Sequence, residues 1–289
     1  MGLTPEEANY FVTEVLQVGP VLEKERLSLL DDIIEAFQRE IPFQNITACG
    51  TAPEKRHLPT WLEIKHDVFA KVGGLCLHLH VFLKELLTAL GYDVYYAKAT
   101  IRAPFDHIGL VAVNVSFVGS KHLVEAAGFP TFQAIPLDFE GFSEIYHRSF
   151  LRQKFEMRAG GRLLWYHEAR YEALPFSKYE MTDDGFYKFA EYDINTPYTF
   201  DPFKPYLEKC FTVEGFSFVL ECPKATKFVR RTLVAIKLEF QLSEDEWKGI
   251  KRTQIENFDS YVNLFSEIFP EISREVVEVV ANKYVFPLA

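Results

Sequence analysis

The sequence predicts an α+β fold in which helices and strands occupy separate layers, and three observations predict it. From Glu6 to Glu40, apolar residues recur at every third or fourth position, which is the period of helices with one buried face. Segments 94–101, 107–117 and 122–127 are instead rich in β-branched and aromatic residues, as strands are. The last part of the chain mixes both patterns. Helices, then strands, then a mixed end is an order typical of an α+β protein.

The individual elements follow from local signals. Proline disfavours helix in the residue before it, so the opening helices are expected to stop at Ile41. Two further helices are expected over 60–71 and 75–90, the second ended by Gly91 in a left-handed cap. The later elements are expected in this order: strands near 161–171, 211–220 and 231–242, then a helical tail over 243–280 whose clearest apolar face is 259–269.

Composition and charge exclude several classes of protein. With 48% hydrophobic and 15% aromatic residues, the 289-residue chain has the makeup of a globular protein. Its net charge of −10 and the lack of a long Lys/Arg run argue against a nucleic-acid partner. No stretch offers the ~20 apolar residues that span a bilayer, and residues 1–7 lack the basic-then-apolar order of a signal peptide. A cytoplasmic protein without membrane contact is therefore expected.

The four cysteines are expected to be free thiols. They show neither the paired C-x-x-C spacing of a zinc site nor the density of a disulfide framework. We therefore expect no metal site and a reducing compartment. The four lie at positions 49, 76, 210 and 222.

One of these thiols has the surroundings of a nucleophile. The segment Gly73-Gly74-Leu75-Cys76 lies where a loop enters a strongly apolar helix. Unpaired backbone N–H groups and the positive end of the helix dipole favour a thiolate there, and the same amides can hold a developing oxyanion. The two glycines let backbone and substrate approach closely, which makes Gly74 a candidate substrate contact.

His107 and Glu125 are the candidate partners of Cys76. A thiolate needs a base and an acid for acyl transfer, and His107, at the start of a strand, can serve as both. A carboxylate on the neighbouring strand would orient the imidazole, and Glu125 is the ionisable residue in that place. His78 and His80 take second place, because two and four residues along the helix they are expected to point on or away.

The role of Glu125 depends on the strand register. A tight two-residue turn at 119–120 would set Glu125 opposite Asn114, too far along the strand to reach the histidine. A looser loop over 116–120 would set it opposite residues 109–111, where contact is expected. The looser loop is therefore the prediction.

Four ordered blocks in the first half of the chain carry a family resemblance. They are Ile41-Pro42-Phe43-Gln44-Asn45-Ile46, residues 69–76 ending in Gly-Gly-Leu-Cys, residues 83–94 with their Ala-Leu-Gly-Tyr turn, and the His107 strand followed by Leu123–Phe129. In this order they resemble the motifs of the arylamine N-acetyltransferases. The chain departs from that pattern at four positions: Val72 replaces the motif arginine, His78 a glutamate or glutamine, His80 an asparagine and Glu125 an aspartate.

The resemblance implies a fold, a site and co-substrates. It implies a helical domain over 1–91 that carries the nucleophile, a β-barrel-like domain over 92–200 and an α/β lid over 201–289, around a cysteine-protease-like core. It also implies acetyl-coenzyme A, or another short acyl-coenzyme A, as acyl donor and an aromatic amine or hydrazine as acceptor, in an enzyme of xenobiotic metabolism. Carried over by position, Cys76 would be the acyl carrier, His107 the acid and base, and Glu125 the orienting carboxylate, with Phe43 and Phe129 flanking the acceptor pocket.

Two other interpretations of the function stay open on the sequence alone. One is an amide synthase of the same fold that takes its acyl group from a carrier-bound chain. The other is a binding protein that kept the pocket and lost turnover, which the altered residues around Cys76 would suit. Acetyl, propionyl and malonyl donors, the physiological acceptor and the oligomeric state are left undecided by the sequence.

Overall fold

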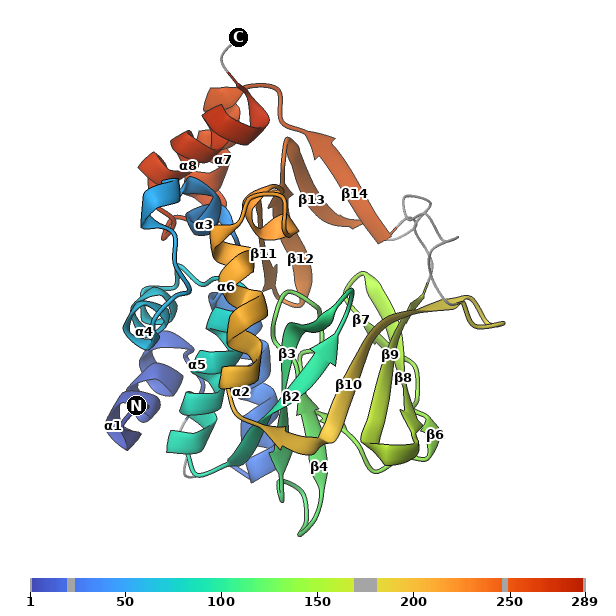
Figure 1. The fold of residues 1–289 in the computed structure, drawn as a ribbon. Coiled ribbons are helices and arrows are strands. Elements are labelled where there is room, and N and C mark those ends of the chain that lie inside the picture. The colour runs from blue at the N-terminus through green and yellow to red at the C-terminus, as the bar shows by residue number, and fades with distance from the viewer. Residues whose placement is uncertain (1, 20–23, 169–180, 246–248, 288–289) are drawn as a thin grey trace.

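The computed structural model describes residues 2–19, 24–168, 181–245 and 249–287. Helices gather on one side of a large antiparallel sheet, and a smaller sheet with the C-terminal helices lies at one end of the molecule (Figure 1). This arrangement confirms a mixed α and β architecture. None of the described helices is both long enough and apolar enough to span a bilayer.

The N-terminal helices form where the apolar period predicts them. The described helices are Pro5–Tyr10 (α1), which widens into a π-helical turn over Phe11–Val15, then Arg26–Glu40 (α2), Ile46–Gly50 (α3), Trp61–Phe69 (α4), Cys76–Ala89 (α5), Lys204–Thr212 (α6), Phe258–Ile268 (α7) and Arg274–Val280 (α8). Helix α2 buries Leu30, Ile33 and Phe37. As predicted, α2 ends before Ile41, and Gly91 follows α5 with φ +80°.

The large sheet is antiparallel and open. Its strands are Asp93–Thr100 (β2), Pro104–Val113 (β3), Lys121–Val124 (β4), Ile135–Pro136 (β5), Gly141–Phe142 (β6), Tyr146–Arg148 (β7), Leu151–Arg158 (β8), Arg162–Glu168 (β9) and Phe186–Tyr198 (β10). They follow the order β5-β4-β3-β2-β10-β9-β8-β6, with β7 beside β8. Over the described residues β5 and β6 are unpaired with each other, so the expected barrel does not close.

The small sheet joins the two ends of the chain. Its strands are Phe43–Gln44 (β1), Lys224–Val229 (β11), Thr232–Lys237 (β12), Phe240–Asp245 (β13) and Gly249–Gln254 (β14), in the order β1-β11-β12-β13-β14. Strand β1 comes from the helical part of the sequence, yet it pairs with β11, so the first and last parts of the chain share one sheet.

Two expectations for the last part of the chain are wrong. The strand expected near 211–220 is replaced by α6, whose buried residues Leu207, Cys210 and Phe211 follow a helical spacing, and by a short 3-10 turn over Phe218–Leu220. The helical tail does not start at 243, because strands β13 and β14 occupy its beginning. Residues 246–248 of the predicted tail lie outside the described residues, as do residues 169–171 of the strand predicted near 161–171. The helix with the clearest apolar face is confirmed as α7.

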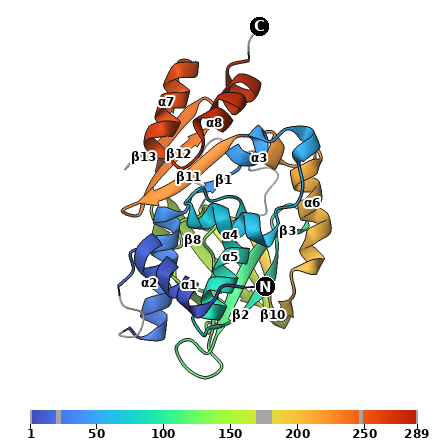
Figure 2. The same ribbon diagram turned by 90° about the vertical axis from the view of Figure 1, so that its left-hand side faces the viewer.

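The core packs α5 against the sheet and the other N-terminal helices. Helix α5 contacts both β2 and β3, and α2 and α5 lie together in front of the sheet in the turned view (Figure 2). Phe82 of α5 stacks on Phe37 of α2 and meets Phe11 at a centroid distance of 4.7 Å. Aromatic packing of this kind stabilises the base on which α5 is held.

Asn45 ties the last part of the chain to the first. Its side-chain amide donates to the carbonyls of Val219 and Cys222 at 3.0 Å, and at 3.3 Å to that of Phe218. The side-chain oxygen Oδ1 of Asn45 accepts the backbone N–H of Lys224 at 2.7 Å. Because Asn45 is 1% exposed, these backbone groups have no water to replace it.

Replacing Asn45 with alanine is therefore expected to lower the free energy of unfolding by about 3 kcal/mol, since several buried backbone groups lose their partner at once. Urea unfolding of the two proteins measures this directly. The matched control is Asn9→Ala on the exposed face of α1, which should change stability by less than about 0.5 kcal/mol. Equal effects of the two substitutions would show that Asn45 does not hold the segment.

Candidate active site

The turn before α5 requires both of its glycines. Gly73 has φ +73°, and a Cβ there would lie 2.0 Å from the Pro42 carbonyl oxygen. A Cβ on Gly74 would lie 2.4 Å from the His78 ring. The turn is fixed to β1, because the Gly74 N–H donates to Pro42 at 3.1 Å and its carbonyl accepts from Gln44 at 2.9 Å. These contacts set Cys76 at the first position of α5, half-buried.

This position gives the thiol a local electrostatic advantage. The first-turn N–H groups of a helix have no partner within the helix, and the helix dipole places partial positive charge at that end. His78 lies behind the turn: its Nδ1 accepts the Leu75 N–H at 3.3 Å, and burial lowers the pKa of His78 to about 4. His78 is therefore a neutral support of the turn.

His107 lies between Cys76 and Glu125. Its Nε2 donates to Glu125 Oε2 at 2.8 Å. The Cys76 thiol lies close enough to the ring to help raise the pKa of His107, and since Nε2 is engaged by the carboxylate, Nδ1 is the nitrogen left for the sulfur. His107 is 3% exposed and Glu125 fully buried. The three side chains predicted to act together are thus in contact.

The register that allows this contact confirms the looser loop. Strands β3 and β4 pair Leu110 with Val124, so the next pair along sets Glu125 opposite Gly109. Asn114 instead faces Ser120, to whose carbonyl its N–H donates at 2.8 Å. The loop is therefore residues 115–119, one position earlier than expected, and the tight turn that would have removed Glu125 from the site is excluded.

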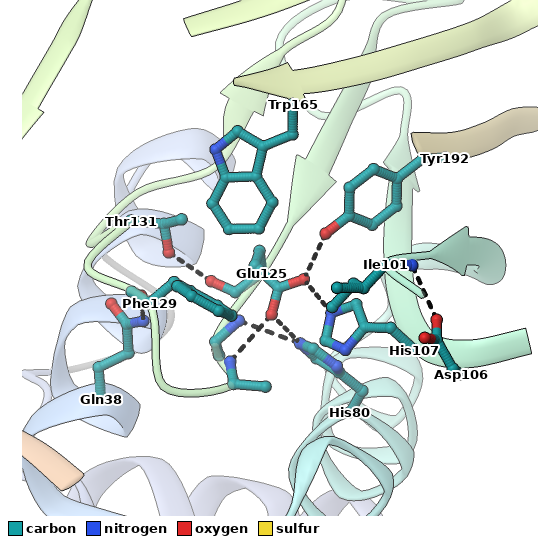
Figure 3. Close-up of polar contacts among 12 residues, drawn as sticks. Gln38, His80, Ile101, Asp106, His107, Glu125, Phe129, Thr131, Trp165 and Tyr192 are labelled. Carbon is teal, nitrogen blue, oxygen red and sulfur yellow. Dashed lines mark hydrogen bonds and ion pairs between the residues drawn. The ribbon is translucent and has the colours of Figure 1, made fainter. Parts of the chain in front are cut away.

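Four groups surround the Glu125 carboxylate (Figure 3). On Oε2, His107 is joined by the Tyr192 hydroxyl, which donates at 2.9 Å. On Oε1, the Ala127 N–H donates at 3.0 Å and His80 Nε2 lies at 3.1 Å. The expectation that His80 points away from the site is wrong, because residues four apart on a helix share a face, and His80 lies one turn along α5 from Cys76.

These contacts fix the charges in the cluster. Burial raises the pKa of Glu125, but the charges of His80 and His107 and their hydrogen bonds outweigh it and hold that pKa far below its usual value. Burial likewise lowers the pKa of His107, yet the Glu125 charge and the bonds to Cys76 and Glu125 raise it well above the usual value. Burial and the Glu125 charge also raise the pKa of Tyr192, which stays a hydroxyl donor. The favoured state is a carboxylate beside an imidazolium.

The same groups resemble a metal-binding set in composition only. One ligand atom from each of His80, His107 and Glu125 lies within 4.8 Å of the others. The 2.8 Å contact between His107 and Glu125 is a direct hydrogen bond, and all four positions around the carboxylate are engaged by donors or imidazole. The described residues therefore favour a hydrogen-bonded cluster over a cation site.

Cys76 and His107 open into a cavity of about 540 Å³. Phe43 and Phe129, the two residues expected to flank an acceptor, line the same cavity. Phe129 is held edge-on against Trp165, with ring centroids 5.1 Å apart. Gly74 does not line this cavity: it borders a separate hollow of about 410 Å³ behind the nucleophile turn.

Two members of the cluster were not predicted to belong to it: His80, which was expected to point away, and Tyr192. The position of His80 could have been predicted, because it follows Cys76 by four residues and therefore lies one turn along the same face of the helix. Tyr192 lies in β10, which reaches Glu125 only through the pairing of β10 with β2. No local signal in the sequence links Tyr192 to the site.

The fold and the cluster define a mixed α and β protein in which a cysteine at the start of a helix lies beside a histidine that is bonded to a buried glutamate. More particularly, the chain belongs to the N-acetyltransferase family, whose sequence model matches residues 26–268. Chicken (Gallus gallus) arylamine N-acetyltransferase, pineal gland isozyme, is 30% identical in an alignment 115 positions long that covers 36% of this chain and 37% of that protein.

Solved structures agree in fold over nearly the whole chain. The arylamine N-acetyltransferase of Mycobacterium marinum, in complex with CoA, has a TM-score of 0.75 at 15% identity, with 96% of this chain and 100% of that one covered. That of Nocardia farcinica has a TM-score of 0.75 at 13% identity, with 96% and 94% covered. At such low identity, these two matches establish the fold.

Proposed function

We propose that the chain is an acyl-coenzyme A-dependent arylamine or hydrazine N-acetyltransferase that carries the acyl group as a thioester on Cys76. The observation that carries this proposal is the Cys76–His107–Glu125 chain of contacts at the wall of an aromatic-lined cavity. Family membership and the CoA bound to the M. marinum enzyme support the choice of donor.

In the first half-reaction the Cys76 thiolate attacks the thioester carbonyl of acetyl-coenzyme A. The first-turn N–H groups of α5 stabilise the oxyanion that forms on the carbonyl oxygen. The carbon–sulfur bond to coenzyme A then breaks, and the leaving thiolate takes the proton of His107. The acetyl group is left on Cys76, and the imidazole is neutral.

In the second half-reaction the amine attacks the acetyl–Cys76 carbonyl. His107 accepts the proton that the nitrogen loses, the amide bond forms and the bond to Cys76 breaks. The thiolate and imidazolium are restored. Throughout, Glu125 holds the Nε2–H tautomer and stabilises the imidazolium, since its own charge is fixed by its four contacts.

Water must be kept from the acyl-enzyme for transfer to exceed hydrolysis. We propose that residues 201–289 act as a cover over the site, opposite a helical unit of 1–91 and a strand-rich unit of 92–200. This is supported by the cavity-lining residues contributed by α6, Phe216–Val219 and β11. The bonds of Asn45 to the backbone of this segment hold the cover in place.

Steady-state kinetics with acetyl-coenzyme A and an aromatic amine such as 4-methylaniline test the proposal. Because the donor product leaves before the acceptor reacts, double-reciprocal plots at several amine concentrations should be parallel. Intersecting lines would contradict the acyl-enzyme route. A protein that only binds ligands would give no amide at all.

A further inference from the structure

The cavity beside Cys76 contains a lysine ammonium, Lys224, that forms no ion pair with any residue the structure describes. Lys224 and Thr226, alternate residues on one face of β11, line the cavity, as does Cys222 just before the strand. The Lys224 ammonium lies over two aromatic rings, 4.7 Å from the centroid of Phe43 and 4.5 Å from that of Phe218. Among the described residues no carboxylate lies within ion-pair distance of it.

The other charged groups of the cavity leave this cation uncompensated. Arg102 and Lys237 also line the cavity, and Lys237 is the cross-strand neighbour of Lys224. Asp106 is the one carboxylate among the described lining residues, and it accepts the backbone N–H groups of 101–103 at 2.7 to 2.9 Å. In a chain of net charge −10, the cavity lining is therefore locally positive.

The position of Lys224 relative to the nucleophile is fixed by β1. Phe43, which packs on the ammonium, bridges to Gly74, two residues before Cys76. Burial, followed by the neighbouring Lys237, lowers the pKa of Lys224 to about 8, while the Cys76 charge acts in the opposite direction. A partly desolvated ammonium of this kind is stabilised when a buried anion reaches it.

We propose that Lys224 is the recognition point for a carboxylate carried by the group that lies against Cys76. The substrate class is thus a carboxylate-bearing acyl chain or a carboxylate-bearing aromatic amine. Both would enter the same cavity, one in each half-reaction. The phosphates of coenzyme A are a poorer match, because the length of the pantetheine arm separates them from the reacting sulfur. This inference rests on the proposed acyl transfer through Cys76.

Matched substrate pairs test the proposal and distinguish the two sources. In the donor arm, intact-mass spectrometry follows acylation of Cys76 by malonyl- and succinyl-coenzyme A against propionyl- and butyryl-coenzyme A. In the acceptor arm, 4-aminobenzoate is compared with 4-aminobenzamide in the discharge of acetyl-enzyme. The two members of each pair differ in the carboxylate and share the same coenzyme A moiety or the same aromatic ring. Contacts to the coenzyme A phosphates therefore cancel when the rates of the two members are compared as a ratio.

In one of the two arms the wild type should react faster with the carboxylate-bearing substrate than with its neutral counterpart. Lys224→Met should lower this ratio of rates by about ten- to a hundredfold, while Lys224→Arg should retain most of it. Lys227→Met is the matched control, because Lys227 lies on the opposite face of β11, over the Phe269 ring at 5.3 Å, and should leave both ratios unchanged.

A fall in the donor ratio identifies the acyl chain as the source of the carboxylate, and a fall in the acceptor ratio identifies the amine. Wild-type protein that prefers the neutral partner in both arms would overturn the proposal without any variant, as would equal effects of Lys224→Met and Lys227→Met. If acetyl-coenzyme A acylates Cys76 but neither ratio favours the carboxylate, this inference fails while the proposed function stands. If no thioester acylates Cys76, the function itself fails.

Discussion

Replacing His107 with glutamine is expected to slow acetylation of Cys76 by about 10³- to 10⁴-fold. The substitution removes both the group that stabilises the thiolate and the acid that protonates the departing coenzyme A sulfur, and general acid–base catalysis alone contributes about 10²- to 10⁴-fold. Rapid-quench mixing with acetyl-coenzyme A, read by intact mass, measures the acylation step separately from amine transfer.

The control for this experiment is His122→Gln. His122 is buried on β4, the strand next to His107, and its Nε2 contacts Ser116 Oγ at 3.0 Å, away from the cavity. Its loss should leave the acylation rate within a few-fold of wild type. A rate for His107→Gln that matches the His122→Gln rate would remove His107 from the mechanism.

Glu125→Gln is expected to reduce the acylation rate by at least about 10²-fold, because an amide has the size of the carboxylate but cannot hold an imidazolium by charge. The same substitution is expected to change how the reactivity of Cys76 depends on pH. The Glu125 charge raises the pKa of His107 well above its usual value, so without it the imidazolium is lost at lower pH. The pH range in which thiolate and imidazolium coexist should therefore narrow from its alkaline side, as measured by iodoacetamide alkylation of Cys76.

Glu125→Asp serves as the comparison, since it keeps the charge and shortens the reach by one methylene. It should retain the wild-type shape of the pH profile at a reduced rate, because the shorter carboxylate cannot keep all four contacts at their present distances. If the glutamine variant has the wild-type alkaline limit, the carboxylate does not set the charge of His107.

The first half of the molecule could be predicted because local signals there agree with the tertiary structure. The apolar period of 6–40 matches α1 and α2, and the two glycines before Cys76 match a turn that tolerates no Cβ. The contact between His107 and Glu125 required the looser of two possible loops, because loop length fixes the register of a hairpin, and the structure has that looser loop.

The last part of the chain could not be predicted, and each failure has a physical cause. Within the described part of the chain, strand β14 pairs with β13 alone and is mostly exposed, so its polar sequence carries no alternation. Helix α6 begins beside Pro205, which fits a first helical turn, but the aromatic residues after it suggested a strand. Tyr192 reaches Glu125 only through the sheet order β3-β2-β10, which sequence periodicity does not determine.

Intact-mass spectrometry after brief incubation with acetyl-coenzyme A, without any amine, tests the central claim most directly. The wild-type protein should gain one acetyl group, about 42 Da, which an aromatic amine then removes. The Cys76→Ala variant should gain none. The Cys222→Ser variant, which alters another half-buried thiol, should still be acetylated. An adduct that persists in Cys76→Ala, or amide formed by that variant at the wild-type rate, would contradict the account.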